Sequence, residues 1–195
     1  MNRLPETPSQ TVGPYFSMRL AGEGENRLAP AGTPGERLRV EGRVLDGDRA
    51  HIEDALLEIW QANAGGRYRH ADDTRDEIAL EEGFTGFGRA ASDFSTGEYW
   101  FETVKPGPVP DPEGEWQAPH LNVVIQARGM LLPSFTRIYF SDEAAANDHD
   151  MVLRMVPAAR RSTLIAQLVE GTTDPHVYRF DFKFQGDDET VFFDF

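Results

Sequence analysis

The stretch that most constrains this chain is Leu56–His70, which reads LLEIWQANAGGRYRH. Its first half is bulky and apolar apart from Glu58, which is typical of a buried strand. Its second half, Asn63–Gly66, carries paired glycines that adopt positive φ at low steric cost, so we expect a tight turn. Tyr68 follows at once among cationic side chains. The stretch predicts a core strand that turns sharply and presents a phenol, and on spacing alone an ordinary hairpin with a surface tyrosine is favoured over a functional site.

Period-two alternation predicts the other strands. Arg37–Asp46 places apolar and charged residues on opposite faces, as a half-buried strand does. Further strands are expected at 97–104, 120–127, 135–140 and 178–184. Two short helices are expected, one capped by Ser141–Glu143 and one running from Pro157 to about Val169. Short strands separated by turn signals predict an all-β fold, an antiparallel β-sandwich with long loops.

The first 36 residues differ in character from the rest. Residues 1–36 are rich in proline and glycine and show little periodicity, so we expect an N-terminal arm, with residues 37–195 forming a single β-sandwich domain. Within the arm, Gln10–Phe16 is apolar for a free tail. The arm is therefore expected to dock, either on its own domain or on a partner, and composition leaves both open.

Charge and composition exclude several classes of function. The net charge of −14 argues against nucleic acid or an anionic membrane as partner, and an anionic substrate would need a local cationic patch. The absence of cysteine excludes disulfides and thiolate metal sites. No apolar run approaches a membrane span and the first residues lack the apolar core of a signal peptide, so the expected location is the cytoplasm.

Six stretches together resemble the intradiol ring-cleaving dioxygenases, non-haem iron enzymes that split catechols between the two hydroxyl-bearing carbons. One is the motif W-Q-A-x-x-x-G-x-Y at 60–68. The others are ETPSQTVGPYF at 6–16, TVKPGPVP at 103–110, APHLNVVI at 118–125, TRIYFSDE at 136–143 and YRFDFKFQGDDETVFFDF at 178–195. The resemblance covers nearly the whole chain and implies a β-sandwich with loops over one end. It is strongest to a chain that pairs with a homologous, iron-carrying chain.

The resemblance implies four ligands to Fe(III), two tyrosinates and two histidines. Tyr68 and His120 stand at matching positions, but Val109 and Asn122 stand where the second tyrosine and second histidine belong. An arginine that precedes the Ala-Pro-His segment of active members is replaced here by Gln117. Two ligands leave a hard trication undercoordinated and short of negative charge. These five positions are therefore expected to form a vestigial site that binds no metal.

With two ligand positions changed, the resemblance implies a non-catalytic alpha subunit with no catalytic residues of its own. Its homologous beta partner would hold Fe(III), and a higher-order alpha–beta oligomer would convert 3,4-dihydroxybenzoate and O2 to 3-carboxy-cis,cis-muconate. From the resemblance, this chain would contribute one wall of the partner's pocket through Thr11, Gly13, Pro14, Tyr15 and Arg137. On strand pattern alone, Arg137 is a solvent-facing arginine in a surface ion pair.

Two alternatives stay open. One is a homo-oligomeric iron dioxygenase with altered ligands, against which Val109 and Asn122 speak. The other is a β-sandwich module that binds sugar or protein and has no oxygenase chemistry, against which the full-length resemblance speaks.

Overall fold

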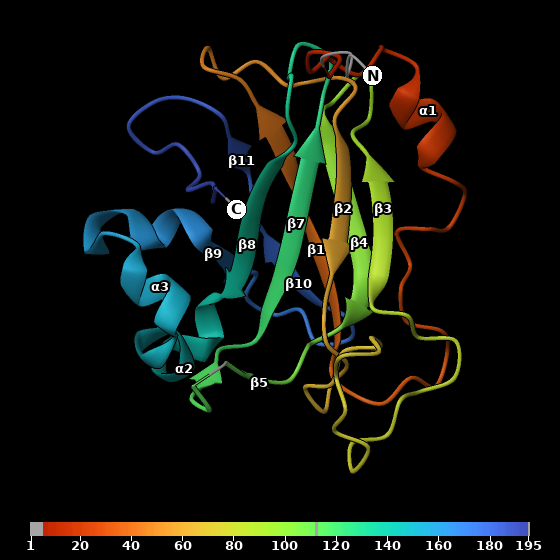
Figure 1. The fold of residues 1–195 in the computed structure, drawn as a ribbon, viewed down its shortest axis with the longest axis vertical. Helices are drawn as coiled ribbons and strands as arrows, with labels where there is room; N and C mark the ends of the chain where they lie inside the picture. The colour runs from red at the N-terminus through yellow and green to blue at the C-terminus, as the bar shows by residue number, and fades with distance from the viewer. Residues whose placement is uncertain (1–5, 112, 195) are drawn as a thin grey trace, which may run out of the picture.

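The strands of this chain form one large mixed sheet and a small hairpin (Figure 1). The structure, a computed structural model, describes residues 6–111 and 113–194, so the first five residues of the expected arm and Phe195 lie outside it. The sheet contains β1 (Arg37–Leu45), β2 (Leu56–Trp60), β3 (Phe87–Ala91), β4 (Glu98–Val104), β7 (His120–Gln126), β8 (Ser134–Phe140), β9 (Ile165–Leu168), β10 (His176–Arg179) and β11 (Phe182–Lys183). The hairpin pairs β5 (Val109–Pro110) with β6 (Trp116–Gln117).

The sheet folds back on itself until it is nearly a barrel. Its strand order is β11-β1-β10-β9-β8-β7-β2-β3, and β4 pairs with β1 on the opposite edge. The all-β prediction is confirmed, but a purely antiparallel sandwich is wrong. β1 runs parallel to β10 and β11. β8 runs parallel to β9, because the helical segment between them is a crossover that brings the chain back to the end of the sheet where β8 began.

The main core lies inside this fold, between the half that contains β1 and β4 and the half that contains β2, β7 and β8 (Figure 1). Alternating residues of each strand point inward, as the sequence pattern predicts. The fully buried inward side chains include Leu38, Val40, Leu57, Ile59, Phe101, Leu121, Ile125, Ile138 and Phe140. A second, smaller cluster covers the outer face of β8 and is made of Ala118, Tyr139, Leu153, Val156 and Leu164.

The two predicted helices are only partly right. Ser141–Glu143 forms a 3₁₀ turn that leads into α2 (Ala144–His149), and no side-chain hydrogen bond caps either segment. The expected helix from Pro157 to Val169 is wrong: a 3₁₀ segment (Ala158–Leu164) leads directly into β9. Pairing with β8 and β10 overrides local helix propensity there. Two further helices were not predicted, α1 (Phe16–Leu20) in the arm and α3 (Met151–Met155).

The strand predicted at 178–184 is present but interrupted. β10 and β11 keep one continuous register beside β1, and the ladder breaks between them at Asp181. There the Asp181 carboxylate accepts a hydrogen bond from the Arg43 backbone N–H at 2.9 Å, in place of a backbone carbonyl. Gly42 makes this approach possible, since a Cβ on it would lie 1.8 Å from the Phe180 carbonyl oxygen.

From residue 6 onward, the arm contains one segment that packs on the domain and one that is exposed. Leu28 and Ala29 are buried, and the Leu28 N–H donates to the Glu102 carbonyl oxygen of β4, so this part packs on its own domain. By contrast, Tyr15 is 76% exposed and Met18 65% exposed. The division at residue 36 stays a prediction. No helix among residues 6–111 and 113–194 is long and apolar enough to cross a bilayer.

Candidate functional site

A row of polar and aromatic side chains crosses the outer face of three neighbouring strands. Trp60 of β2 lies opposite Asn122 of β7, and Asn122 lies opposite Arg137 of β8. The next outward position along β7 is His120, which lies opposite Tyr139. Because successive residues of a strand alternate faces, the inward neighbours of these residues fill the core while this row is left for other contacts.

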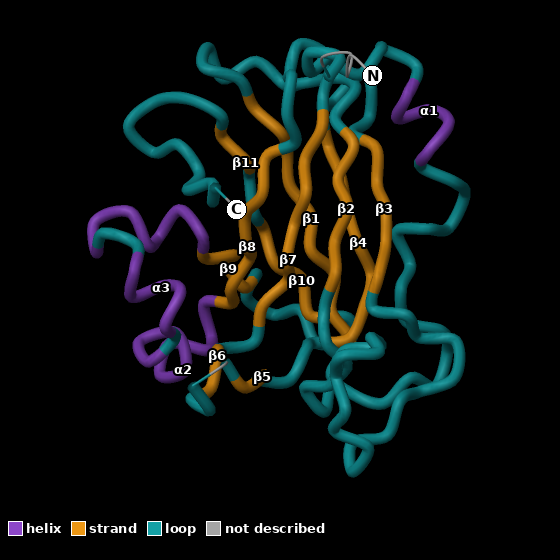
Figure 2. Tube along the Cα trace, viewed as in Figure 1, coloured by secondary structure: helices purple, strands orange, loops and turns teal. Residues whose placement is uncertain are grey.

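Loops build a cavity of about 550 Å³ over this row. Tube colouring in Figure 2 shows the long loops gathered at one end of the strands, near β5 and β6. The turn after β2 brings in Tyr68, whose backbone N–H donates to the Asp73 carboxylate at 2.8 Å. Gly66 makes the turn at φ 84°, with the Pro108 carbonyl where a Cβ would project. The β5–β6 hairpin adds Val109 and Gln117.

The structure therefore brings together all five positions of the vestigial site. They are Tyr68, Val109, Gln117, His120 and Asn122, and all line this one cavity. Sequence reasoning did not assign to it Trp60, His70, Asp73 and Arg75, which also line it. The register between β2, β7 and β8 could have identified Trp60, but the loop residues depend on a loop conformation that no local pattern predicts.

Arg137 also lies in this cavity, where its guanidinium holds the polar side chains together. Its Nε donates to Asn122 Oδ1 at 3.1 Å, and one terminal nitrogen donates to Gln117 Oε1 at 2.8 Å and to the Tyr139 hydroxyl at 3.3 Å. The solvent-facing surface ion pair that the strand pattern favours is thus not what forms. The side chain is partly buried among neutral partners inside this chain, and its expected contact with a partner's substrate stays a prediction.

The hydrogen bonds define the protonation states of the site. His120 Nδ1 lies 2.7 Å from the Ala118 carbonyl oxygen, which can only accept, so Nδ1 carries the proton and Nε2 is free to accept. Tyr68 OH lies 3.4 Å from that Nε2 and receives a bond from Asn122 Nδ2 at 3.0 Å. The Tyr68 hydroxyl is therefore the donor to His120, which requires a phenol and not a phenolate.

Burial favours the uncharged form of both titrating groups, His120 and Tyr68. Burial, together with the nearby Arg137 charge, lowers the pKa of His120 to about 3, so this imidazole is neutral at pH 7. Burial raises the pKa of Tyr68 above its ordinary value, and the bond from Asn122 opposes this only in part. The pair is consequently an uncharged phenol beside an uncharged imidazole.

These residues do not fit the Fe(III) site that the resemblance implies. Tyr68 and His120 supply two of the four donors, and Val109 has no lone pair to offer. The Asn122 carbonyl oxygen, a poor substitute for imidazole, already accepts from a guanidinium. No three His, Cys, Asp or Glu side chains gather at metal-binding distance anywhere in the described sequence. The side chains present here can form hydrogen bonds, and the Arg137 guanidinium can bind an anion.

A buried carboxylate supports the site from behind. Asp150 is fully buried and accepts from the Tyr139 hydroxyl, from the Leu153 N–H at the start of α3, and from the Ala118 N–H. It thereby holds Tyr139, which contacts Arg137, and Ala118, which orients His120. No sequence motif signals Asp150, because its partners come from three separate segments.

The four arm residues expected at a partner's pocket lie at the far end of β7 from the cavity. Gly129, in the turn that follows β7, donates its backbone N–H to Thr11 Oγ1 at 2.7 Å, whereas His120 begins that strand. Seven residues of strand span roughly 20 Å. Gly13, Pro14 and Tyr15 follow Thr11 and are exposed. The arm and the vestigial site therefore do not form one pocket within this chain.

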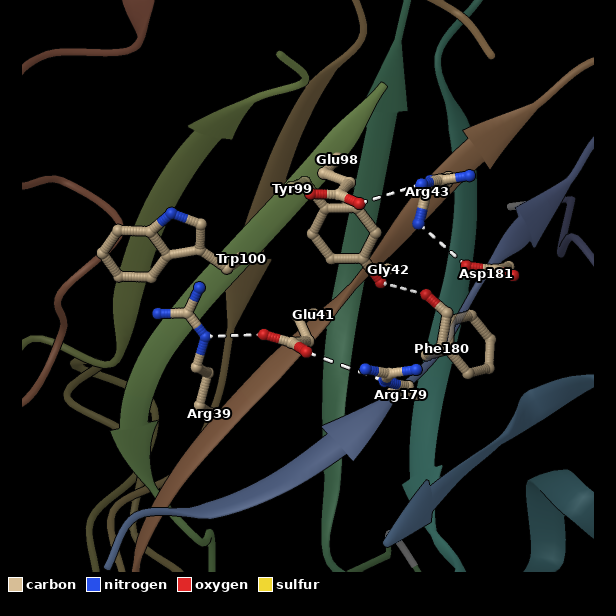
Figure 3. Close-up of a pocket in the computed structure, with 10 residues that line it drawn as sticks. All are labelled: Arg39, Glu41, Gly42, Arg43, Glu98, Tyr99, Trp100, Arg179, Phe180 and Asp181. Atoms are coloured by element: carbon tan, nitrogen blue, oxygen red, sulfur yellow. Dashed lines mark hydrogen bonds and ion pairs between the residues drawn. The ribbon is translucent and has the colours of Figure 1, made fainter. Parts of the chain in front are cut away.

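A second hollow, on the outer face of β1, β4 and β10, is a charged groove (Figure 3). Its cations already have partners. Arg39 and Arg179 both pair with Glu41, and Arg43 pairs with Glu98 at 3.0 Å. Because these charges neutralise one another and reach solvent, we interpret the groove as the solvated face of the sheet and not as a second site.

Comparisons with known proteins agree with the geometry. The family described as Dioxygenase matches residues 11–186. The chain is 45% identical to the protocatechuate 3,4-dioxygenase alpha chain of Pseudomonas putida over 98% of each protein, and 44% identical to the alpha chain of Burkholderia cepacia over the full length of both. It is 35% identical to the beta chain of the Burkholderia cepacia enzyme over 80% of this chain and 67% of that one.

Solved structures share the fold. The dioxygenase domain of a dioxygenase–carbohydrate-binding fusion from Streptomyces sp. SirexAA-E superposes with a TM-score of 0.62 at 26% identity, covering 92% of this chain and 97% of that one. An intradiol ring-cleavage dioxygenase from Tetranychus urticae gives the same TM-score at 18% identity, covering 96% of this chain and all of the other. Together with the full-length matches above, this places the chain in the intradiol dioxygenase family.

Proposed function

We propose that this chain is the non-catalytic alpha subunit of a protocatechuate 3,4-dioxygenase. The enzyme would cleave 3,4-dihydroxybenzoate between its two hydroxyl-bearing carbons, and both atoms of O2 would enter the product, 3-carboxy-cis,cis-muconate. The observation that carries the proposal is full-length identity of 44–45% to two alpha chains, combined with a cavity that keeps only two of the four implied iron ligands.

Fe(III) would be held by a homologous beta chain, which would supply the activation of substrate and O2. This chain would bind none, because the Arg137 guanidinium bonds to Asn122, the position where a second histidine ligand would stand. What this chain would supply is structure, and contact with the partner through Thr11, Gly13, Pro14 and Tyr15. These arm residues are exposed, Thr11 accepts a hydrogen bond from the turn that follows β7, and none of the four lines this chain's own cavity.

Co-expression with a homologous beta chain tests the proposal. We expect the two chains to co-purify in equal amounts, with iron stoichiometric to the beta chain and 3,4-dihydroxybenzoate cleavage only in the complex. Tyr68→Phe in this chain should leave turnover within about twofold, whereas loss of a tyrosine ligand in the beta chain should abolish it. Stoichiometric iron and activity in this chain alone would instead support a homo-oligomeric dioxygenase. Failure to bind the beta chain would support a separate binding module.

A further inference from the structure

The Arg137 guanidinium carries a charge that no acidic side chain of the described residues neutralises. Its hydrogen bonds go to Asn122, Gln117 and Tyr139, all of which are uncharged. Its second terminal nitrogen has no hydrogen-bond partner in residues 6–111 and 113–194. This nitrogen is not among the fully buried polar atoms that lack a partner, and Arg137 lines the cavity. That nitrogen carries two N–H groups, which can donate to an incoming anion beside the positive charge.

The other charged side chains that line the cavity are either paired with each other or exposed to solvent. Arg75 is paired with Asp73 at 2.6 Å, and that contact holds the pKa of Asp73 at about 2. Asp72 lies next to His70 at the rim, with its side chain 92% exposed to solvent. Arg137 is consequently the unpaired cation of the site, and it is oriented by three hydrogen bonds before any ligand arrives.

The wall beside Arg137 is aromatic. Trp60 lies two strands away in the same row, and it is 38% exposed despite its size. The centroid of its ring lies 4.6 Å from that of Tyr68 and 5.8 Å from that of His70. Cavities of this volume that combine an aromatic wall with a few oriented polar groups are typical small-molecule sites.

We propose that this cavity binds a small aromatic carboxylate, with the carboxylate on Arg137 and the ring against Trp60. The ligand would be held by an ion pair and by ring stacking, without a metal, and all of these contacts would come from this chain. It goes beyond the proposed subunit role, because it assigns the vestigial site a ligand of its own.

The test measures binding to the full-length chain purified without a partner, by isothermal titration calorimetry. The probes are benzoate, benzamide and acetate. We expect one benzoate per chain, with benzamide and acetate each at least tenfold weaker because one lacks the charge and the other lacks the ring. Equal binding of benzoate and benzamide, or no benzoate binding at millimolar concentration, would overturn the proposal without any variant.

Variants then locate the site. Arg137→Gln should weaken benzoate at least tenfold, Arg137→Lys less, and Trp60→Leu should weaken benzoate but not acetate. Arg179→Gln is the matched control, an arginine paired with Glu41 on the other half of the sheet, and should bind as the wild type does. Circular dichroism confirms folding of each variant. Unchanged benzoate affinity in folded Arg137→Gln would place the ligand elsewhere and refute the assignment. Because no partner is present, these outcomes do not depend on whether the subunit role holds.

Discussion

At the scale of single residues, His120 makes the stability of the fold depend on pH. Its pKa is about 3 in the folded chain against about 6.5 in an unfolded one, so the unfolded state takes up the proton first. The contribution is complete above pH 6.5 and is lost as the pH falls toward 3. Between pH 7 and pH 5 the loss is about 2 kcal/mol.

We therefore predict that His120→Gln flattens this dependence. The variant loses the bond to the Ala118 carbonyl and should be less stable at pH 7, but its melting temperature should fall less than the wild type's between pH 7 and pH 5. Calorimetric melts at four pH values measure this. Above pH 7 the two curves should run parallel. Identical slopes at acid pH would show that His120 is not the titrating group.

Arg137 sets a condition for restoring an iron site. Val109→Tyr and Asn122→His restore the four-ligand set, and Gln117→Arg restores the arginine of active members. The guanidinium of Arg137, however, stays among the ligands. We predict substoichiometric iron in this triple variant and close to one iron per chain when Arg137→Gln is added. Metal analysis and the tyrosinate-to-iron absorbance band measure both. Turnover should stay low, because supports beyond the ligands are not restored.

Arg137→Gln alone is the control, and should bind no iron, because Val109 and Asn122 remain. If the triple variant bound as much iron as the quadruple variant, Arg137 would not be the obstacle.

The sequence predicts which residues line this site better than it predicts how they interact there. Motif positions identify Tyr68, Val109, Gln117, His120 and Asn122, and the structure brings them together. The alternation of β8 also places Arg137 on the face opposite Ile138. Only the pairing of Asn122 in β7 with Arg137 in β8 shows that this face carries the cavity, and such pairing is set by the tertiary structure.

At the scale of elements, the junction of β1 with β10 and β11 depends on a missing side chain. A Cβ at Gly42 would lie 1.8 Å from the Phe180 carbonyl oxygen, a backbone atom that cannot rotate away. We predict that Gly42→Ala lowers the free energy of unfolding by on the order of 3 kcal/mol. Chemical denaturation measures it. Gly13→Ala, where a Cβ would meet nothing within 4 Å, should change stability little. Equal effects would contradict the crowding argument.

Elements with strong alternation are predicted well, and those decided by pairing are not. β1, β2, β4, β7 and β8 appear within about two residues of their expected bounds. Ala158–Leu168 has helix-forming residues, yet Leu164 and Ala166 are fully buried, and the second half joins the sheet. One of its two partner strands, β8, lies on the far side of α2 and α3 in the chain, so a local window does not contain all the pairing that decides its conformation.

At the scale of the whole molecule, residues 6–15 contribute little to the fold. They are exposed apart from the half-buried Val12, and Thr11 provides a hydrogen bond to Gly129. We predict that deleting residues 1–15 shifts the melting temperature of the lone chain by less than roughly 3 °C. The same deletion should abolish assembly with an iron-bearing beta chain, as measured by size-exclusion chromatography. Thr11→Ala should retain assembly. A truncated chain that still assembles would place the interface elsewhere.

The parallel pairing of β1 with β10 and β11 has a consequence for synthesis. β1 leaves the ribosome long before β10 and β11, the two strands that pair with one of its edges. Until then the nascent chain presents an incomplete edge and an open core. Closure of the sheet therefore waits until β10 and β11 have been synthesised and have left the ribosome, and up to that point the nascent chain exposes aggregation-prone surface.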